Sequence, residues 1–225
     1  MSCRLHPHYR IENSDRGVSH IYQPGVNSRI IVVLACPGEN EKALGFPAAG
    51  ETGARLCRIF EKMREFGDGK YEDVCLRNVR IVNASVNVYD SSSQIRKVDV
   101  ILNPFLKSAL IKTQGTQRRL ILLLGQHAIW AYCWIARKYK ISGDSVVRFC
   151  HIGQNGLGHI KGLNKSKLLD RIASYFVESD CKAGEYGWEE FVKMTKLRWS
   201  GKKTAEWMRK GILEIGLWPF DSDEN

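Results

Sequence analysis

The sequence predicts an α/β protein, a three-layer α/β/α sandwich around a central, mostly parallel four-stranded sheet with helices added at the C-terminus. Three observations support this prediction. Four short apolar runs have the composition of buried strands, segments of helical period lie between them, and 44% of the 225 residues are apolar. We therefore expect residues 1–225 to form one domain, with a core over about 29–178 and a helical extension over about 179–225.

The predicted strands are rich in β-branched residues or leucine, and each ends in polar or turn residues. They cover 29–36, 79–86, 119–125 and 146–152. Polar residues at 89–93 and a glycine-rich stretch at 153–162 form two loops. Loops that follow strands are where an α/β sheet binds its ligands, so both loops are candidates for a functional site.

The predicted helices are marked by apolar residues at helical spacing. One helix follows Thr52 and carries Leu56, Ile59, Phe60 and Met63; another follows Gln126 and carries Ile129, Ala131, Cys133 and Trp134. The closing helices carry Leu168, Leu169, Ile172, Ala173 and Phe176, then Met208, Ile212 and Ile215. His127 is expected on a helix surface, and the six tryptophans are expected mostly in packing roles.

The charge balance indicates a polyanionic partner, because 34 Lys and Arg against 24 Asp and Glu give a net charge of +10. No signal peptide or membrane span is found in the sequence. Seven cysteines without a C-x-x-C pair or zinc-like spacing are typical of reduced thiols. We therefore expect a cytoplasmic protein, a monomer that does not bind a membrane.

A long glycine- and proline-rich turn follows the first predicted strand, and such turns bring backbone N–H groups close to a ligand. Its pattern runs P-G-x-x-E, three residues, G-x-P, two residues, G-x-x-G and an apolar helix. The matching residues are Pro37, Gly38, Glu41, Gly45, Pro47, Gly50, Gly53 and Leu56. This segment resembles the first motif of the iron–sulfur branch of the uracil-DNA glycosylase superfamily.

Three further segments fall in the order of that family. They are a strand ending in Asn83, the strand-turn-helix LLLGQHA at 122–128, and a strand ending in His151 before a loop. The resemblance covers about residues 29–178. It implies a DNA partner and an enzyme that flips a base into a pocket and hydrolyses its N-glycosidic bond.

The resemblance assigns a role to each segment. Asn83, which both donates and accepts, would read the edge of the base, although an asparagine that caps a strand end is common. His151, or its rival His159, would stabilise negative charge on the departing base. The predicted base pocket consists of Cys36, Pro37, Gly38, Glu41, Ala48 and Gly50.

The loop after His151 is the predicted DNA contact, through Gln154, Asn155, Leu157 and Lys161. Leu157 is expected to act as a wedge in the base stack, and the alternative is that it anchors the loop on the core. Lys161 suits a phosphate. The basic run Lys196, Arg198, Lys202 and Lys203 is either a further backbone contact or a solvated helix end.

Four departures from the family pattern bear on the chemistry. Leu34-Ala35 replaces the Gly-Glu that positions water, Cys36 stands where related branches have Asp or Asn, and His-Ile replaces His-Pro after the last strand. We assign Glu39 to water or base contact and Glu41 to holding the loop. The cysteines that hold the cluster are absent, so we expect no iron–sulfur cluster, no metal and no other cofactor.

A fifth departure is Ala48, which stands where the family has an aromatic residue that stacks on uracil. An enlarged pocket is similar to that of bacterial anti-phage glycosylases that excise α-glucosyl-hydroxymethylcytosine. Glu39 would accept from the cytosine amino group, and Tyr89, Asp90 and Ser91 to Ser93 would bind the sugar. The alternatives are a glycosylase for uracil or a small damaged pyrimidine, with Phe46 stacking, or an inactive DNA-binding relative.

Overall fold

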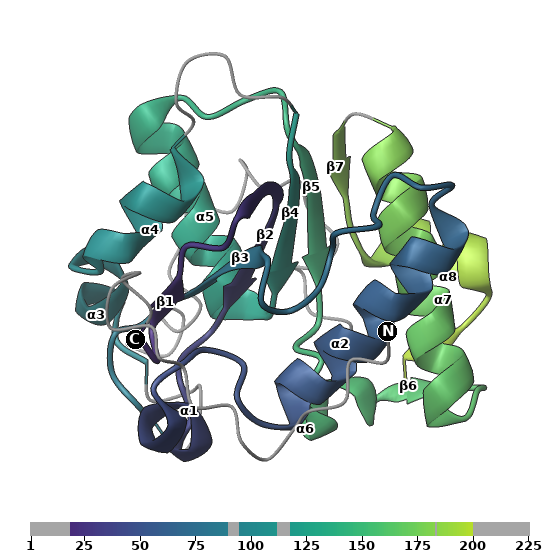
Figure 1. Cartoon of the computed structure of the whole chain (residues 1–225), viewed down its shortest axis with the longest axis horizontal. Helices are drawn as coiled ribbons and strands as arrows, with labels where there is room; N and C mark the ends of the chain where they lie inside the picture. Colours follow the sequence, from purple (N-terminus) through teal and green to yellow (C-terminus); the bar gives the residue numbers. More distant parts are fainter. Residues whose placement is uncertain (1–18, 90–94, 112–117, 183, 200–225) are drawn as a thin grey trace, which may run out of the picture.

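The protein folds around a mixed sheet of six strands in the order β1-β3-β2-β4-β5-β7 (Figure 1). The computed structural model describes residues 19–89, 95–111, 118–182 and 184–199. The strands are β1 (Tyr22–Gln23), β2 (Asn27–Leu34), β3 (Val79–Asn83), β4 (Leu120–Leu124), β5 (Ser145–Phe149) and β7 (Gly184–Tyr186). Only β1 is antiparallel to its neighbour. The predicted α/β class is therefore confirmed.

The predicted number of strands was wrong, because two short edge strands extend the sheet. β1 pairs with β3, and β7 pairs with β5 in parallel. With two and three residues, neither strand has the length from which an alternating or apolar pattern can be recognised. A second small sheet pairs β6 (Ile160–Lys161) with β8 (Arg198–Trp199). β6 lies within the predicted glycine-rich loop, and β8 lies within the predicted helical extension.

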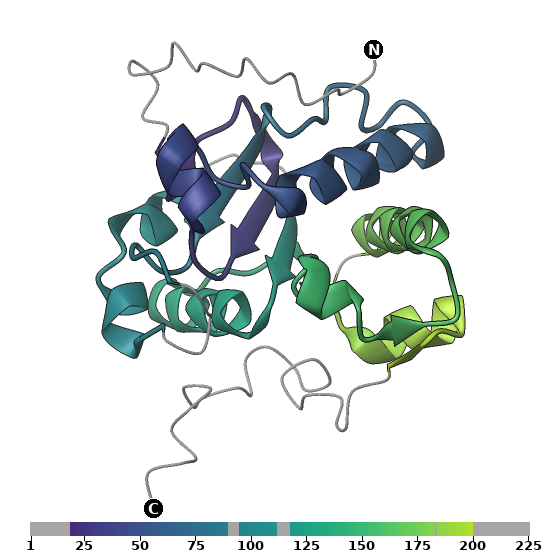
Figure 2. The same ribbon diagram turned by 90° about the horizontal axis from the view of Figure 1, so that it is seen from below.

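Helices cover both faces of the sheet (Figure 2). On one face lie α2 (Glu51–Phe66), α7 (Lys165–Cys181) and α8 (Trp188–Thr195); on the other lie α3 (Lys97–Ile101), α4 (Pro104–Leu110) and α5 (Gln126–Tyr139). Two very short helices, α1 (Glu39–Leu44) and α6 (Gln154–Leu157), follow β2 and β5. The expected helical residues 208–215 lie outside the described part of the chain.

The alternation of side chains along β2 divides the core into two clusters. Ile30 and Val32 face α2 and α7, whereas Ile31 and Val33 face α4 and α5, and all four are fully buried. A strand buried on both faces must be apolar throughout, which is the pattern that the sequence shows.

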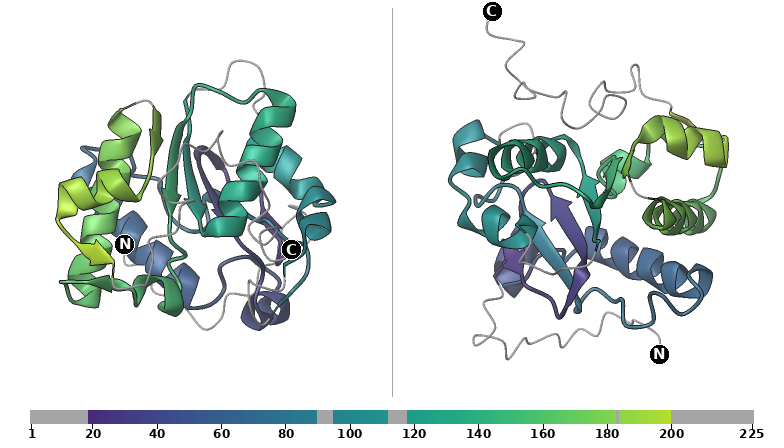
Figure 3. Two further views of the ribbon diagram at one scale, coloured as in Figure 1. Left: turned by 180° about the vertical axis from the view of Figure 1, so that it is seen from behind. Right: turned by 90° about the horizontal axis from the view of Figure 1, so that it is seen from above.

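Strand β7 forms the edge of the sheet next to α7 (Figure 3). On the neighbouring strand β5, the ring of Phe149 packs edge-on against the rings of Phe176 and Phe191.

Candidate functional site

The candidate site lies at the edge of the sheet where the four central strands end. Because β3, β2, β4 and β5 are parallel, their carboxyl ends meet at this edge. The chain leaves β2 toward β3 on one side and then crosses from β3 to β4 on the other. A crossing of this kind opens the crevice in which open α/β sheets bind ligands, here between β2 and β4.

Glu41 organises the turn that follows β2. Its carboxylate accepts a hydrogen bond from the N–H of Gly38 and another from the N–H of Ala48, the latter at 2.6 Å. Burial raises the pKa of Glu41, and hydrogen bonds from Gly38, Ala48 and the Asn83 side chain partly offset that rise. One side chain therefore joins both ends of the turn to β3, which is the loop-holding role that we expected for Glu41.

Asn83 is the last residue of β3 and is fully buried. Its Nδ2 donates to the backbone carbonyl of His20 at 2.9 Å, and its own carbonyl accepts from Asn103 at 2.7 Å. In the described part of the chain, its Oδ1 has no hydrogen-bond partner. A buried amide oxygen without a partner is costly, so this atom is a candidate acceptor for a ligand.

His151 follows β5 by two residues, and a neighbouring backbone N–H determines which ring nitrogen carries the proton. Its Nδ1 accepts the N–H of Gly153 at 3.0 Å, so we assign the proton of the neutral ring to Nε2. Burial and the positive charge of Arg55 lower the pKa of His151 below its usual value. The ring is therefore neutral at neutral pH, with an N–H to donate.

Arg55 of α2 supports the loop that carries His151. Its side chain is 5% exposed, and its Nη1 donates to the carbonyl of Ile152 at 2.5 Å. Its Nη2 pairs with Glu51, which also accepts from Lys165 at 3.0 Å. The first turns of α2 and α7 are thus joined beside the loop.

Gly156 allows the same loop to close tightly. A Cβ at Gly156 would lie 1.7 Å from the carbonyl oxygen of His151. Because this distance is a steric clash, only glycine fits at this position. Gly53 plays the same part in the turn after β2, since a Cβ there would lie 1.7 Å from the carbonyl oxygen of Ala48. The glycines of the sequence pattern therefore permit close backbone contacts on both sides of the site.

Asn83 and His151 lie at the same edge of the sheet, Asn83 as the last residue of β3 and His151 two residues after β5. β3 and β5 are three strand positions apart, and with about 4.8 Å between neighbours their backbones are roughly 14 Å apart. A base bound at this edge over β2 and β4 would lie between these two residues. The arrangement can therefore offer an acceptor on one side of a bound base and a neutral N–H donor on the other.

Two predictions about the site are corrected by burial. Leu157, expected as a wedge, is 5% exposed and packs in the core, so it anchors its loop. Ala48, expected to line an enlarged pocket, is fully buried against the core with φ +57. Its N–H donates to Glu41, and Phe46 is likewise buried.

The other predicted residues are spread around this edge. Glu39 is exposed in the first turn of α1, and Gly50 is partly buried beside Asn40. Pro37 is buried, whereas burial and the charge of Glu41 raise the pKa of the Cys36 thiol to about 11. The Cys36 thiol is therefore protonated at neutral pH.

The predicted DNA-contact residues are only partly described. Lys161 is exposed on β6, as is the rival His159 just before it. The side chains of Gln154, Asn155 and Arg198 lie outside the described part of the structure. So do the loop residues Asp90 and Ser91 to Ser93, together with Lys202 and Lys203.

His127 is buried, contrary to the prediction of a helix-surface histidine. It is 3% exposed at the start of α5, and burial lowers its pKa to about 4. The prediction failed because α5 is buried almost all round by the sheet and by α4, so its apolar stripe does not mark one exposed face. The packing role expected of the tryptophans is confirmed for Trp130 and Trp188.

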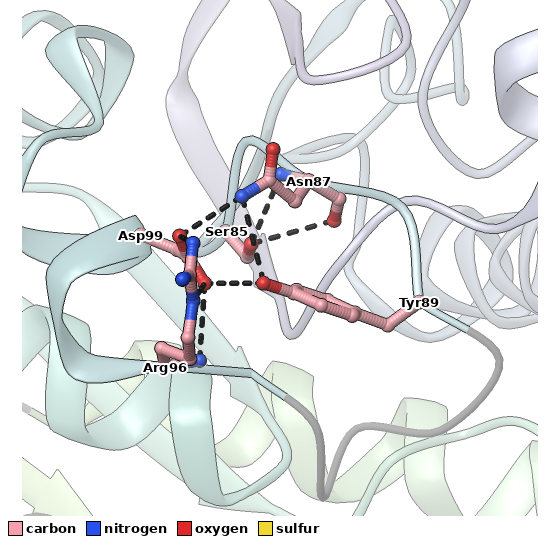
Figure 4. Close-up of polar contacts among 5 residues, drawn as sticks. All are labelled: Ser85, Asn87, Tyr89, Arg96 and Asp99. Atoms are coloured by element: carbon pink, nitrogen blue, oxygen red, sulfur yellow. Dashed lines mark hydrogen bonds and ion pairs between the residues drawn. The ribbon is translucent and has the colours of Figure 1, made fainter.

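A polar network after β3 was missed by the sequence reasoning (Figure 4). The Asp99 carboxylate accepts from Asn87 at 2.9 Å, from the Tyr89 hydroxyl, and from Arg96 through the backbone N–H, Nε and Nη2. Burial raises the pKa of Asp99, but the hydrogen bonds from Arg96 and Tyr89 outweigh it and the pKa is lowered. The available signal was an acidic residue three positions after Arg96, the spacing that closes a helix N-terminus.

Comparisons with known proteins leave the family open. No family model matches the chain, and no curated protein matches it significantly in sequence. Among the described residues, no group of three or more His, Cys, Asp or Glu side chains could hold a metal ion. None of the described helices is both long and apolar enough to cross a membrane.

Proposed function

We propose that the protein is a DNA glycosylase that flips a modified base from DNA and hydrolyses its N-glycosidic bond. The observation that carries the proposal is that Asn83 and His151 lie at the same edge of one sheet, where Asn83 has a buried amide oxygen without a partner and His151 a neutral ring with an N–H at Nε2. The motif from Pro37 to Gly53 and the net charge of +10 support it.

In this mechanism the bond between the base and the sugar C1′ breaks, and its electron pair moves onto the base. The N–H at Nε2 of His151 donates to the base oxygen on which negative charge develops, so it binds the transition state better than the ground state. A neutral donor suits this role because it keeps its proton at neutral pH. Water adds to C1′, releases a proton, and leaves an abasic site.

Asn83 favours a cytosine-type base in this proposal. Because its Nδ2 already donates to the His20 carbonyl, its Oδ1 is the atom that remains to contact a base. An acceptor there suits the exocyclic amino group of cytosine, whereas the equivalent position of uracil is itself an acceptor. We therefore propose a modified cytosine such as α-glucosyl-hydroxymethylcytosine in phage DNA, with Glu39, exposed at the start of α1, positioning water.

The burial of Ala48 removes one argument for a bulky base, so uracil or a small damaged pyrimidine remains the alternative substrate. An inactive DNA-binding relative remains the alternative from another class. It would bind DNA in a salt-sensitive manner and release no base.

The test is abasic-site formation, read by alkaline strand cleavage, on glucosylated hydroxymethylcytosine DNA, uracil DNA and unmodified DNA. We expect cleavage of the glucosylated DNA alone, lost in Asn83→Ala and His151→Ala while DNA binding stays within several-fold. His159→Ala is the matched control and should keep activity. Cleavage of uracil DNA alone would select the alternative substrate, and silence on all three DNAs would leave the inactive DNA-binding relative.

A further inference from the structure

A second polar pocket adjoins the candidate site at the carboxyl end of β3. It has a volume of about 640 Å³ and lies between α1, the loop after β3 and the residue before α3. Its lining residues are His20, Lys42, Val86, Asn87, Val88, Tyr89 and Arg96. A volume of several hundred Å³ is typical of a site for an organic molecule rather than for a single small ion.

The lining of this pocket is cationic. Lys42 is exposed on α1, and the Arg96 side chain is 68% exposed. Among the described lining residues there is no carboxylate, since Asp99 lies behind Arg96 with its side chain 4% exposed. Two cations at the described part of the wall attract an anionic group.

Asp99 fixes the guanidinium of Arg96 in position. Arg96 binds this carboxylate as a fork, with Nε at 3.2 Å and Nη2 at 2.9 Å, and the same carboxylate accepts from Asn87 and Tyr89 (Figure 4). Three lining residues are therefore held by one buried acid. A cation that is already ordered loses little conformational entropy when it binds a ligand.

The pocket is connected to the candidate base site through His20. The carbonyl of His20 accepts from the Asn83 side chain, while the His20 side chain lines the pocket. A ligand in this pocket would therefore lie next to His20, the residue that holds the Asn83 side chain.

We propose that this pocket binds a nucleotide unit, with Lys42 and Arg96 on its phosphate and Tyr89 and Asn87 beside its nucleoside. The lining decides between ligand classes: two cations suit a phosphate, whereas a neutral sugar needs no cation. The phosphate would contact the ammonium of Lys42 and the Nη1 group of Arg96, which the bonds to Asp99 do not engage. This inference adds a subsite to the proposed glycosylase and does not rest on base excision, because nucleotide binding is measured without any reaction.

The test is a titration of the full chain, followed by isothermal calorimetry and by ¹⁵N NMR shifts. The probes are deoxycytidine 5′-monophosphate, deoxycytidine, inorganic phosphate and methyl α-glucoside. We expect saturable binding of the monophosphate, with the nucleoside and inorganic phosphate at least tenfold weaker, and NMR shifts at Lys42, Asn87 and Tyr89. Lys42→Ala should weaken binding about tenfold, and Lys42→Arg should keep it within threefold.

Lys182→Ala is the matched control, because it removes the same charge from an exposed lysine after α7, away from this edge. Equal binding by the Lys42→Ala and Lys182→Ala variants would overturn the proposal, as would absence of monophosphate binding. The proposal would also be overturned if deoxycytidine or inorganic phosphate bound as tightly as the monophosphate. Binding of methyl α-glucoside that the Lys42→Ala substitution does not weaken would overturn it as well. Lys42 is exposed, so thermal unfolding should show its variants folded.

Discussion

At the residue scale, two glutamates of the same six-residue helix have opposite environments. Glu41 accepts from the backbone of Gly38 and of Ala48 and from the Asn83 side chain, whereas Glu39 is exposed. A glutamine at position 41 would turn an NH₂ group toward a backbone donor. We expect Glu41→Gln to lower the free energy of unfolding by about 1–3 kcal/mol.

Glu39→Gln is the control for that variant, and urea unfolding of both proteins is the measurement. An exposed substitution should change the free energy of unfolding by less than about 0.5 kcal/mol. If the two variants were equally stable, Glu41 would not hold the turn. The same pair separates structure from catalysis, because only Glu39 is proposed to position water.

At the element scale, α2 connects the two sides of the crevice. Its first turn packs on the carbonyl of Ala48 through Gly53, and one turn along the helix Arg55 donates to the carbonyl of Ile152. The helix therefore sets the position of the His151 loop relative to the turn that carries Glu41. Its influence on His151 is both geometric and electrostatic, since the charge of Arg55 also lowers the pKa of His151.

Removing the Arg55 charge should therefore raise the pKa of His151 toward 6.5. We expect Arg55→Met to show this rise in an NMR titration of the ring and, if the proposed activity is present, to slow base release by about ten- to hundredfold. Arg55→Lys keeps the charge and should leave the pKa of His151 nearly unchanged. Arg58→Met, which removes a half-exposed arginine from the same helix, is the matched control. An unchanged His151 pKa in Arg55→Met would refute the electrostatic part of this account.

At the scale of the whole molecule, the central elements could be predicted because each is encoded locally. The four strands buried on both faces are apolar runs, and the helices between them have apolar residues at helical spacing. β1, β7 and β8 could not be predicted, since strands of two or three residues exist only through their partners.

Parts of the candidate site could be predicted from the sequence at positions where a residue type has only one physical use at a fixed spacing. Glu41 and Gly53 belong to this class, because they make close backbone contacts in the turn after β2, whereas the role of His151 stays a prediction. Leu157 and Ala48 failed, because an apolar or small side chain does not reveal whether it faces solvent or core. Asp99 was missed because its partners come from a loop whose path is set by tertiary contacts.

The buried histidines should make the stability of the whole domain depend on pH. The pKa of His127 is lowered from 6.5 to about 4 by burial, so between these values the unfolded chain binds more protons than the folded one. The stabilisation is therefore complete above pH 6.5 and is lost as the pH falls toward 4. The difference corresponds to about 3 kcal/mol for His127.

Urea unfolding at intervals from pH 4 to 7.5 measures this dependence. His151 adds to the loss in acid, because its pKa is lowered too, whereas the raised pKa of Glu41 opposes the loss just above pH 4.5. The His127→Gln variant isolates one group, because His151 and Glu41 remain in both proteins. We expect the free energy of unfolding of the wild type minus that of the variant to rise with pH below 6.5 and to be constant above it. A flat difference for His127→Gln would mean that His127 titrates normally in the folded protein.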